Sequence, residues 1–356
     1  MLKYLRLILF PLSLLYGLII IVRNWCYDLG IFKSVQFDLP VICVGNLAVG
    51  GSGKTPVTEY LVNLLSGKRI AILSRGYGRN TQGFLLADET STASSIGDEP
   101  MQYFSKFPQV TVAVCEDRVK GIRLLEKDHD LIILDDAFQH RRVKAGLYIL
   151  LFEYASMFRM QWMLPTGNLR EPFFGYRRAD AILITKAPSV ISSERKNQIL
   201  NKFADAYKPR VHFAVINYAA YKPVFASSSH RAAALSRDTK VFLLTGIANP
   251  LPLVQHLEGH FQRVSQHRFP DHHRFSATEI SGLVEAFKND STGDKCIITT
   301  EKDAQRLIDA NIKELLVDLP VFYLPIAVQM QAADQDRFNN QIIEYVSNRT
   351  RDRTIY

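Results

Sequence analysis

A glycine-rich segment between an apolar run and an amphipathic stretch constrains the fold of this chain more than any other feature. Residues 48–55 read AVGGSGKT and match the pattern G-x-x-x-x-G-K-[ST], with Ala48 at the first glycine position. The strand-like sequence PVICVGN (40–46) precedes this segment. Apolar residues at helical spacing follow it, at Val57, Tyr60, Leu61, Leu64 and Leu65. A strand, a phosphate-binding loop and a helix in this order predict an α/β fold of the P-loop type.

The loop itself predicts a nucleotide site. Glycines allow backbone N–H groups to surround phosphate oxygens, because a β-carbon would obstruct that approach. We expect Lys54 to contact the β- and γ-phosphates and the Thr55 hydroxyl to bind Mg²⁺. The residues expected to bind the nucleotide are Gly50, Gly51, Ser52, Gly53, Lys54 and Thr55.

A second apolar run ends in two carboxylates and predicts the other half of a magnesium site. Residues 131–136 read LIILDD, so Asp135 and Asp136 follow a buried strand. In P-loop enzymes such a strand lies beside the phosphate loop and holds Mg²⁺ through an Asp. One of the pair could instead cap the next turn, and the sequence does not choose between them.

Further β-branched runs alternate with helical stretches through the first two thirds of the chain. They are Arg69–Ser74, Val110–Cys115, Asp130–Leu134, Leu147–Phe152 and Ala181–Thr185. This alternation predicts a mostly parallel sheet with helices on both faces. The composition changes at SSSHRAAALSR (227–237), after which strand-like runs at 241–245, 296–299 and 321–324 predict a second, smaller α/β lobe.

The N-terminus carries an uncharged apolar run, LILFPLSLLYGLIIIV (7–22), with Arg6 before it and Arg23 after it. No small-residue cleavage site follows, so we do not expect a secretory signal. The run covers about 24 Å as a helix against roughly 30 Å of bilayer hydrocarbon. As a helix, the run therefore either just spans the bilayer or lies partly embedded at the membrane interface. The alternative to membrane association is a helix buried in the protein core. We predict membrane anchoring, with the rest of the chain in the cytoplasm.

We divide the chain into 1–30 (membrane-associated helix), 31–226 (P-loop core) and 227–356 (C-terminal α/β lobe).

The net charge of +8 suits an acidic partner. Its basic residues are dispersed and form no nucleic-acid recognition pattern, so we expect no nucleic-acid partner. The four cysteines lack zinc-ligand spacing. No feature indicates an obligate protein partner.

Several short polar segments fall outside these patterns. SRGYGR (74–79), EDR (116–118) and LREP (169–172) carry arginines that can neutralise charge on a phosphoryl group. A hydroxyl acceptor also requires a base that is not occupied by the metal. The segment GDEP (97–100) offers Asp98 or Glu99 as this base, and FPDHHRF (269–275) offers His272 or His273 to orient it.

Taken together, these segments resemble the tetraacyldisaccharide 4′-kinase family of the lipid A pathway in Gram-negative bacteria. The matching pieces run in order from about residue 40 to residue 307: VGNLAVGGSGKTP, LSRGYGR, GDEP, DDAFQHR, LREP, FPDHHRF and TTEKDAQRL. The resemblance implies that ATP phosphorylates the 4′-hydroxyl of an acylated glucosamine disaccharide 1-phosphate lipid and gives lipid IVA. It places this reaction at the cytoplasmic face of the bacterial inner membrane.

The resemblance also implies roles for individual residues. Asp98 would be the base and would pair with His272 rather than His273, and Arg118 would join Lys54 in catalysis. Thr55, Asp135 and Asp136 would form the metal edge. The residues expected near the lipid substrate are Ser74, Arg79, His140 and Glu171.

A membrane-attached P-loop GTPase or ATPase switch is the main alternative. ILITK (182–186) and TTEKD (299–303) partly match the N/T-K-x-D element that binds guanine. Neither match is complete, because Lys186 lacks the following Asp and Glu301 stands where Asn or Thr is expected. A switch hydrolyses nucleotide slowly without an acceptor, whereas a kinase requires the acylated sugar for fast turnover.

Overall fold

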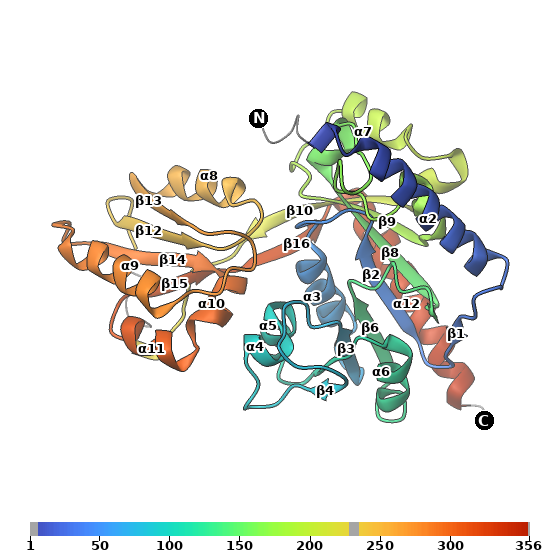
Figure 1. Cartoon of the computed structure of the whole chain (residues 1–356), viewed down its shortest axis with the longest axis horizontal. Coiled ribbons are helices and arrows are strands. Elements are labelled where there is room, and N and C mark those ends of the chain that lie inside the picture. Colours follow the sequence, from blue (N-terminus) through green and yellow to red (C-terminus); the bar gives the residue numbers. More distant parts are fainter. Residues whose placement is uncertain (1–5, 228–234, 355–356) are drawn as a thin grey trace.

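The computed structural model describes residues 6–227 and 235–354, and it contains two α/β lobes (Figure 1). Residues 1–5, 228–234 and 355–356 lie outside the described part. They include the start of the predicted membrane segment and most of the predicted boundary between the lobes.

The larger lobe, here called the P-loop lobe, is built on one large sheet. Its strands are parallel except for the antiparallel pairs at the two edges, β16–β10 and β5–β4. In spatial order the strands are β16 (Ile326–Met330), β10 (Val211–Tyr218), β9 (Ala181–Thr185), β8 (Leu147–Glu153), β2 (Val41–Asn46), β6 (Leu131–Asp135), β3 (Ile70–Ser74), β5 (Thr111–Val114) and β4 (Leu85–Leu86). Short strands β1 (Val35–Gln36) and β7 (Val143–Lys144) pair beside this sheet.

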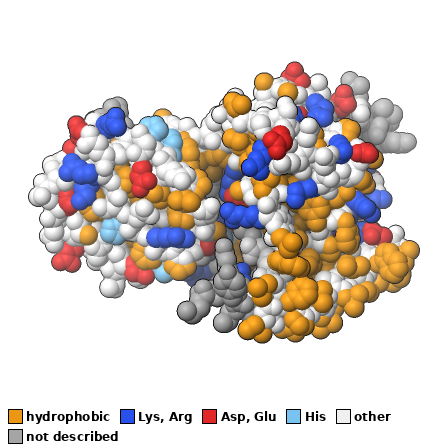
Figure 2. All heavy atoms as spheres, turned by 90° about the horizontal axis from the view of Figure 1, so that it is seen from above, with side chains coloured by type: hydrophobic (Ala, Val, Ile, Leu, Met, Phe, Trp, Pro, Cys, Tyr) orange, Lys and Arg blue, Asp and Glu red, His pale blue; other side chains and the backbone are white. Residues whose placement is uncertain are grey.

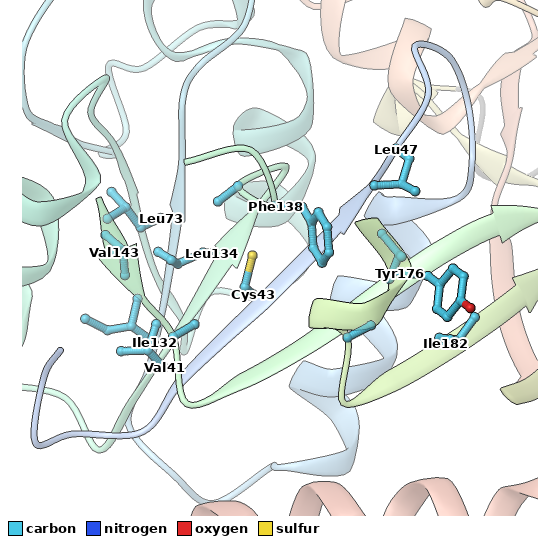
Figure 3. Packing of buried hydrophobic residues seen from close by; sticks show 14 of the residues in the cluster. Val41, Cys43, Leu47, Leu73, Ile132, Leu134, Phe138, Val143, Tyr176 and Ile182 are labelled. Carbon is cyan, nitrogen blue, oxygen red and sulfur yellow. The ribbon is translucent and has the colours of Figure 1, made fainter. Parts of the chain in front are cut away.

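Helices cover both faces of the large sheet, as the sequence predicted. Apolar residues of α6 (Arg118–Leu125) and α7 (Ser193–Leu200) pack on one face. Those of α3 (Lys54–Leu64), α5 (Asp98–Lys106) and α12 (Ala332–Thr354) pack on the other. Figure 3 shows Cys43, Leu134 and Phe138 packed together in the first of these cores.

Gly45 in β2 allows the backbone of Phe138 to approach that strand closely. A β-carbon at Gly45 would lie 2.6 Å from Cβ of Phe138 and 3.0 Å from its backbone nitrogen. We expect Gly45→Ala to lower the free energy of unfolding by about 1–3 kcal/mol, because the contact is with backbone that cannot rotate away. Thermal unfolding measures this loss. Gly259→Ala is the matched control, since a β-carbon there meets nothing within 4 Å, and an equal loss in both variants would contradict the packing argument.

The smaller lobe contains a second, mostly parallel sheet. Its strands in spatial order are β11 (Lys222–Pro223), β15 (Val321–Leu324), β14 (Lys295–Thr300), β12 (Lys240–Thr245) and β13 (Arg263–Arg268). Residues of α9 (Ala277–Asn289) and α11 (Ala310–Leu316) pack on one face, and residues of α8 (Leu251–His260) pack on the other. The short helices α4 (Ala93–Ile96) and α10 (Glu301–Leu307) lie where the two lobes approach each other (Figure 1).

The predicted C-terminal lobe, 227–356, differs from the structure in its last segment. After β15 the chain returns to the P-loop lobe, where β16 pairs with β10 and α12 packs on the sheet through Phe338, Ile342 and Val346. The smaller sheet therefore ends at Leu324. Apolar residues spaced four apart in α12 are the sequence signal for this return.

The predicted N-terminal helix is present as α2 (Phe10–Asp28). Among the helices of the described residues, α2 alone is long and apolar enough to cross a membrane. It lies along the P-loop lobe (Figure 1). Most of its large apolar side chains are exposed, and Figure 2 shows hydrophobic side chains gathered on the surface of this lobe. Those exposed side chains include Leu12, Leu14, Leu15, Leu18, Ile19, Val22 and Trp25.

Candidate active site

The glycine-rich loop joins β2 to α3 and has the backbone conformation that its sequence requires. Gly50 and Gly53 have φ values of 116° and 85°, in the region that side chains disfavour. The hydroxyl of Thr185, at the end of β9, donates to the carbonyl of Ser52 at 2.7 Å. This bond fixes the loop against the sheet, with the N-terminus of α3 at Lys54 directed toward any anion that the loop holds.

Lys54 and Asp136 meet beside the loop. The Lys54 Nζ lies 3.5 Å from Asp136 Oδ2, and Arg170 Nη1 lies 3.1 Å from both Asp136 oxygens. Burial alone would raise the pKa of Asp136, but Lys54 and then Arg170 lower it below its usual range. Asp136 is therefore an ionised carboxylate that is already paired with two cations.

Asp135 is placed differently from its neighbour. It is 3% exposed, and its Oδ1 has no hydrogen-bond partner within the described part of the chain. Burial, followed by the charges of Asp136 and Glu99, raises its pKa to about 7. A buried carboxylate oxygen without a partner fits a divalent cation, which would stabilise its charged form. The described residues contain no group of three or more His, Cys, Asp or Glu residues that could hold a metal. Magnesium sites that use one or two carboxylates, substrate phosphates and water require no such group.

Asp98 and His272 come together across the space between the lobes. Asp98 is the first residue of α5, and His272 lies in the loop after β13, where it has a positive φ of 58°. The His272 Nδ1 lies 3.0 Å from Asp98 Oδ2. Arg306 of α10 contacts both oxygens of Asp98 through Nε and Nη2. Burial would raise the pKa of Asp98, but the hydrogen bonds with His272 and Arg306 hold it well below its usual range.

Of the two candidate histidines, only His272 contacts the candidate base. His273 Nε2 lies 3.0 Å from Glu279, near the start of α9, and its ring stacks on Phe269. A cavity of about 260 Å³ opens beside the Asp98–His272 pair. It is lined by residues of both lobes, including Tyr77, Ser94, Arg274 and Asp309. The pair therefore borders a space between the two lobes.

Arg118 and His140 lie on the side of the predicted metal edge. Arg118 is 2% exposed and donates to the carbonyls of Cys115 and Glu116, both at 3.2 Å. Burial and the neighbouring Arg75 lower its pKa, while Asp136 and Asp135 oppose that shift. Burial, followed by Arg118, lowers the pKa of His140 to about 4, so its imidazole is neutral at pH 7.

Three residues predicted to lie near the substrate make mainly internal contacts in the described structure. Ser74 ends β3 and accepts a long hydrogen bond from the Gly76 amide. Arg79 pairs with Glu116 and donates to the carbonyl of Gly83, which closes the loop after β3. Glu171 is fully buried and accepts from Asn24 of α2 and from Arg178. A contact between these residues and the lipid stays a prediction.

Sequence reasoning gave no site role to two cations, Arg306 and Lys302, and gave Arg170 only the general role of neutralising phosphoryl charge. Arg170 precedes the predicted Glu171 in LREP, yet Arg170 is the residue that contacts Asp136. Arg306 and Lys302 come from TTEKDAQRL, a segment that the sequence linked only to the family resemblance and to a partial guanine-binding element. Lys302 Nζ lies 2.7 Å from Glu99 and 3.0 Å from His272 Nε2. A charged segment directly after a buried strand was the available signal, because such positions lie at the carboxyl edge of a parallel sheet.

The P-loop, the adjoining acidic strand end and a carboxylate facing a cavity define a P-loop phosphotransferase of two α/β lobes. Residues 5–347 match the family model described as tetraacyldisaccharide-1-P 4′-kinase (LpxK). The chain belongs to this family.

Curated relatives and a solved structure agree with that family. The chain is 44% identical to the tetraacyldisaccharide 4′-kinase of Flavobacterium johnsoniae, over 96% of this chain and 97% of the relative. It is 41% identical to the kinase of Bacteroides thetaiotaomicron, over 96% and 94% of the two chains. It is similar to a crystal structure of LpxK from Aquifex aeolicus in complex with ATP. That match has a TM-score of 0.73 and 30% identity, and covers 96% of this chain and 99% of the other.

Proposed function

We propose that this chain carries out the 4′-kinase reaction at a membrane surface, with Asp98 as the base for the acceptor hydroxyl. The family activity is the ATP-dependent 4′-phosphorylation of tetraacyldisaccharide 1-phosphate in lipid A biosynthesis. The observation that carries the proposal is the Asp98–His272 contact, made between the two lobes beside a cavity. The charge of Glu99, the neighbour of Asp98, contributes to the raised pKa of Asp135 at the metal edge. This supports a single site that contains both Asp98 and Asp135.

The reaction proceeds by in-line transfer. The 4′-hydroxyl oxygen attacks the γ-phosphorus, the bond to the β,γ-bridging oxygen breaks, and ADP leaves with that electron pair. The hydroxyl proton moves to a carboxylate oxygen of Asp98. Lys54, at the N-terminus of α3, supplies positive charge to the transferring group, and Arg170 and Arg118 line the same edge.

The low basicity of Asp98 is compatible with this role. Arg306 and His272 keep the carboxylate ionised and therefore ready to accept a proton. Phosphoryl transfer has a loose transition state, in which positioning and charge stabilisation contribute more than removal of the proton. Asp98 thus acts mainly by holding the hydroxyl in line and by receiving its proton late in the step.

Magnesium would be held by the Thr55 hydroxyl and by Asp135, directly or through water. Asp135 is favoured over Asp136 because its Oδ1 has no partner among the described residues, whereas Asp136 is paired with Lys54 and Arg170. When bound, the ion neutralises charge on the β- and γ-phosphates.

The α2 helix supports binding at the interface rather than across the bilayer. Its polar side chains hold it to the P-loop lobe along its length. The Ser13 hydroxyl donates to Thr166 at 2.8 Å, Tyr16 donates to the Arg170 carbonyl at 2.9 Å, and Arg23 donates to the Gln139 carbonyl at 2.7 Å. A helix bound to a folded lobe in this way cannot be surrounded by lipid, whereas its outward apolar face can enter one leaflet. Because the substrate ATP is cytoplasmic, the leaflet is the cytoplasmic one.

Substitution of the outward face tests membrane binding. We expect the Leu15→Glu/Leu18→Glu double variant to weaken binding to phosphatidylglycerol-containing vesicles by at least about 10²-fold. Each buried leucine contributes about 1.5–3 kcal/mol to such partitioning, and both residues are more than half exposed here. Vesicle co-sedimentation measures the bound fraction. Gln255→Glu/Asn289→Glu, on the smaller lobe, is the charge-matched control, and unchanged binding by the leucine variant would exclude α2 as the membrane contact.

The dependence of ATP consumption on the lipid acceptor tests the kinase function against the switch alternative. With ATP and Mg²⁺, ADP production should be slow until tetraacyldisaccharide 1-phosphate is added, and should then rise by orders of magnitude. Production of ADP or GDP at one rate with and without the lipid would favour a switch.

A further inference from the structure

We propose that Lys302 is a positioning residue that selects the tautomer of His272 and thereby keeps the ring bonded to Asp98. The proposal rests on the function proposed above, because it concerns the orientation of the Asp98 base. Lys302 lies in α10, one turn before Arg306, and its side chain is 20% exposed. Its ammonium group stands between Glu99 of the P-loop lobe and the His272 ring.

Both ring nitrogens of His272 have a partner, and the partners differ in kind. The Nδ1 faces Asp98 Oδ2 at 3.0 Å, and the Nε2 faces Lys302 Nζ at 3.0 Å. An ionised carboxylate only accepts hydrogen bonds, and an ammonium group only donates them. The Nδ1 must therefore carry the proton and the Nε2 must be the acceptor. Both contacts specify the same neutral tautomer.

The other charged groups near the ring show why this selection matters. Asp271 Oδ2 lies 3.9 Å from His272 Nε2, so the ring has a carboxylate on each side. Without the Lys302 ammonium group, Asp271 would favour a proton on Nε2. The ring would then be either doubly protonated or in the opposite tautomer. A doubly protonated ring would bind Asp98 more tightly and lower its basicity, and the opposite tautomer would remove the Nδ1–H that Asp98 accepts.

Glu99 and Arg306 complete the arrangement. Glu99 Oε1 accepts from Lys302 at 2.7 Å and fixes the ammonium group beside the ring. Arg306 holds Asp98 from the other side, and the Tyr77 ring packs against His272 with centroids 5.0 Å apart. The ring thus has one orientation, in which its Nε2 is occupied by Lys302. His272 consequently orients Asp98 and is not itself the base.

Two substitutions at Lys302 and one control separate this role from general stability. Lys302→Met removes the hydrogen-bond donor that faces His272 Nε2. Lys302→Arg keeps a cationic group that can only donate hydrogen bonds. The control is Lys106→Met. Lys106 also joins the lobes, through an ion pair with Glu301 at 2.9 Å, and it pairs with Glu59 of its own lobe at 2.8 Å. No hydrogen bond or ion pair of the described structure joins Lys106 to His272.

We expect Lys302→Met in the full-length enzyme to lower kcat by about 10- to 100-fold, the range for loss of a group that orients a site residue. The KM for ATP should stay within about twofold, because the nucleotide contacts of the P-loop are intact. Lys302→Arg should restore most of the turnover. Nitrogen chemical shifts of His272 should show a proton on Nδ1 alone in the wild type, and a proton on Nε2, with or without one on Nδ1, in Lys302→Met.

Each outcome bears on one assignment. An unchanged His272 tautomer in Lys302→Met, or an equal fall in kcat for Lys106→Met, would overturn the proposal for Lys302. These outcomes would leave Asp98 as the base if Asp98→Asn is inactive. Full turnover by Asp98→Asn would instead overturn the base assignment itself. The two failures are therefore distinguishable.

Discussion

Lys54→Ala lowers the turnover of phosphoryl transfer by about 10³-fold, one of the two largest effects that we expect from a single substitution. A fixed positive side chain at the transferring phosphate contributes about 10³–10⁵ in rate at other phosphoryl-transfer enzymes. Lys54 lies at the start of α3, 3.5 Å from Asp136. Its loss would remove charge from the phosphate and leave Asp136 paired with Arg170 alone.

Initial rates at saturating ATP and lipid measure the Lys54 effect. Lys68→Ala is the matched control, because Lys68 lies just beyond α3 and is exposed. Thermal unfolding of both variants should stay close to that of the wild type, since Arg170 still pairs with Asp136 when Lys54 is removed. A Lys54→Ala enzyme that retains more than about a tenth of wild-type turnover would contradict the assignment of this loop to the transferring phosphate.

Asp98→Asn lowers turnover by about 10²–10⁴-fold, the range for loss of a general base. Asparagine keeps the shape of the side chain and can still contact Arg306, but it cannot accept the proton of the hydroxyl. Asp98→Ala is a poorer probe of chemistry, because it would leave the buried Arg306 without one of its partners. Breaking a buried ion pair in this way costs about 3–5 kcal/mol of stability.

Separate measurements of binding and turnover identify the origin of the Asp98 effect. We expect the affinity for ATP to change by less than about threefold, because a base acts on the acceptor and not on the nucleotide. Asp205→Asn, at a side chain that is 95% exposed, is the control. Unchanged turnover in Asp98→Asn would remove this residue from the mechanism, and a large loss of ATP affinity would relocate it to the nucleotide site.

Local patterns predicted most of the P-loop lobe. The phosphate loop lies where AVGGSGKT predicted it, because glycines at positive φ and the following amphipathic helix are properties of a few adjacent residues. Buried strands such as Ala181–Thr185 were predicted correctly since continuous β-branched runs are distinctive. The family itself was evident from the order of short segments along the chain and is confirmed by the match over residues 5–347.

Long-range features could not be read from the same patterns. The edge strand β13 reads RVSQHR, which carries no apolar run, and β16 belongs to a sheet whose other strands lie far earlier in the chain. The contacts of Asp98 with Arg306 and His272 join residues separated by more than 170 positions. Sequence spacing does not report such pairings, because they depend on how the two lobes are held together.

The structure bears on two questions that the sequence left open: which histidine pairs with Asp98, and how the N-terminal helix lies relative to the membrane. The choice between His272 and His273 depends on which ring faces Asp98, and only the first does. The length of the N-terminal run left its depth in the membrane open, and the hydrogen bonds of Ser13, Tyr16 and Arg23 with the P-loop lobe support an interfacial position.

Following the γ-phosphate of labelled ATP is the measurement that tests the central claim most directly. Purified enzyme, Mg²⁺ and tetraacyldisaccharide 1-phosphate should give a lipid that carries the label at the 4′-position, as determined by phosphorus NMR and mass spectrometry. Labelled lipid should form about 10³-fold more slowly with the Lys54→Ala variant. None should form after removal of Mg²⁺ by a chelator. Release of all label as inorganic phosphate, at a rate independent of the lipid, would contradict the account.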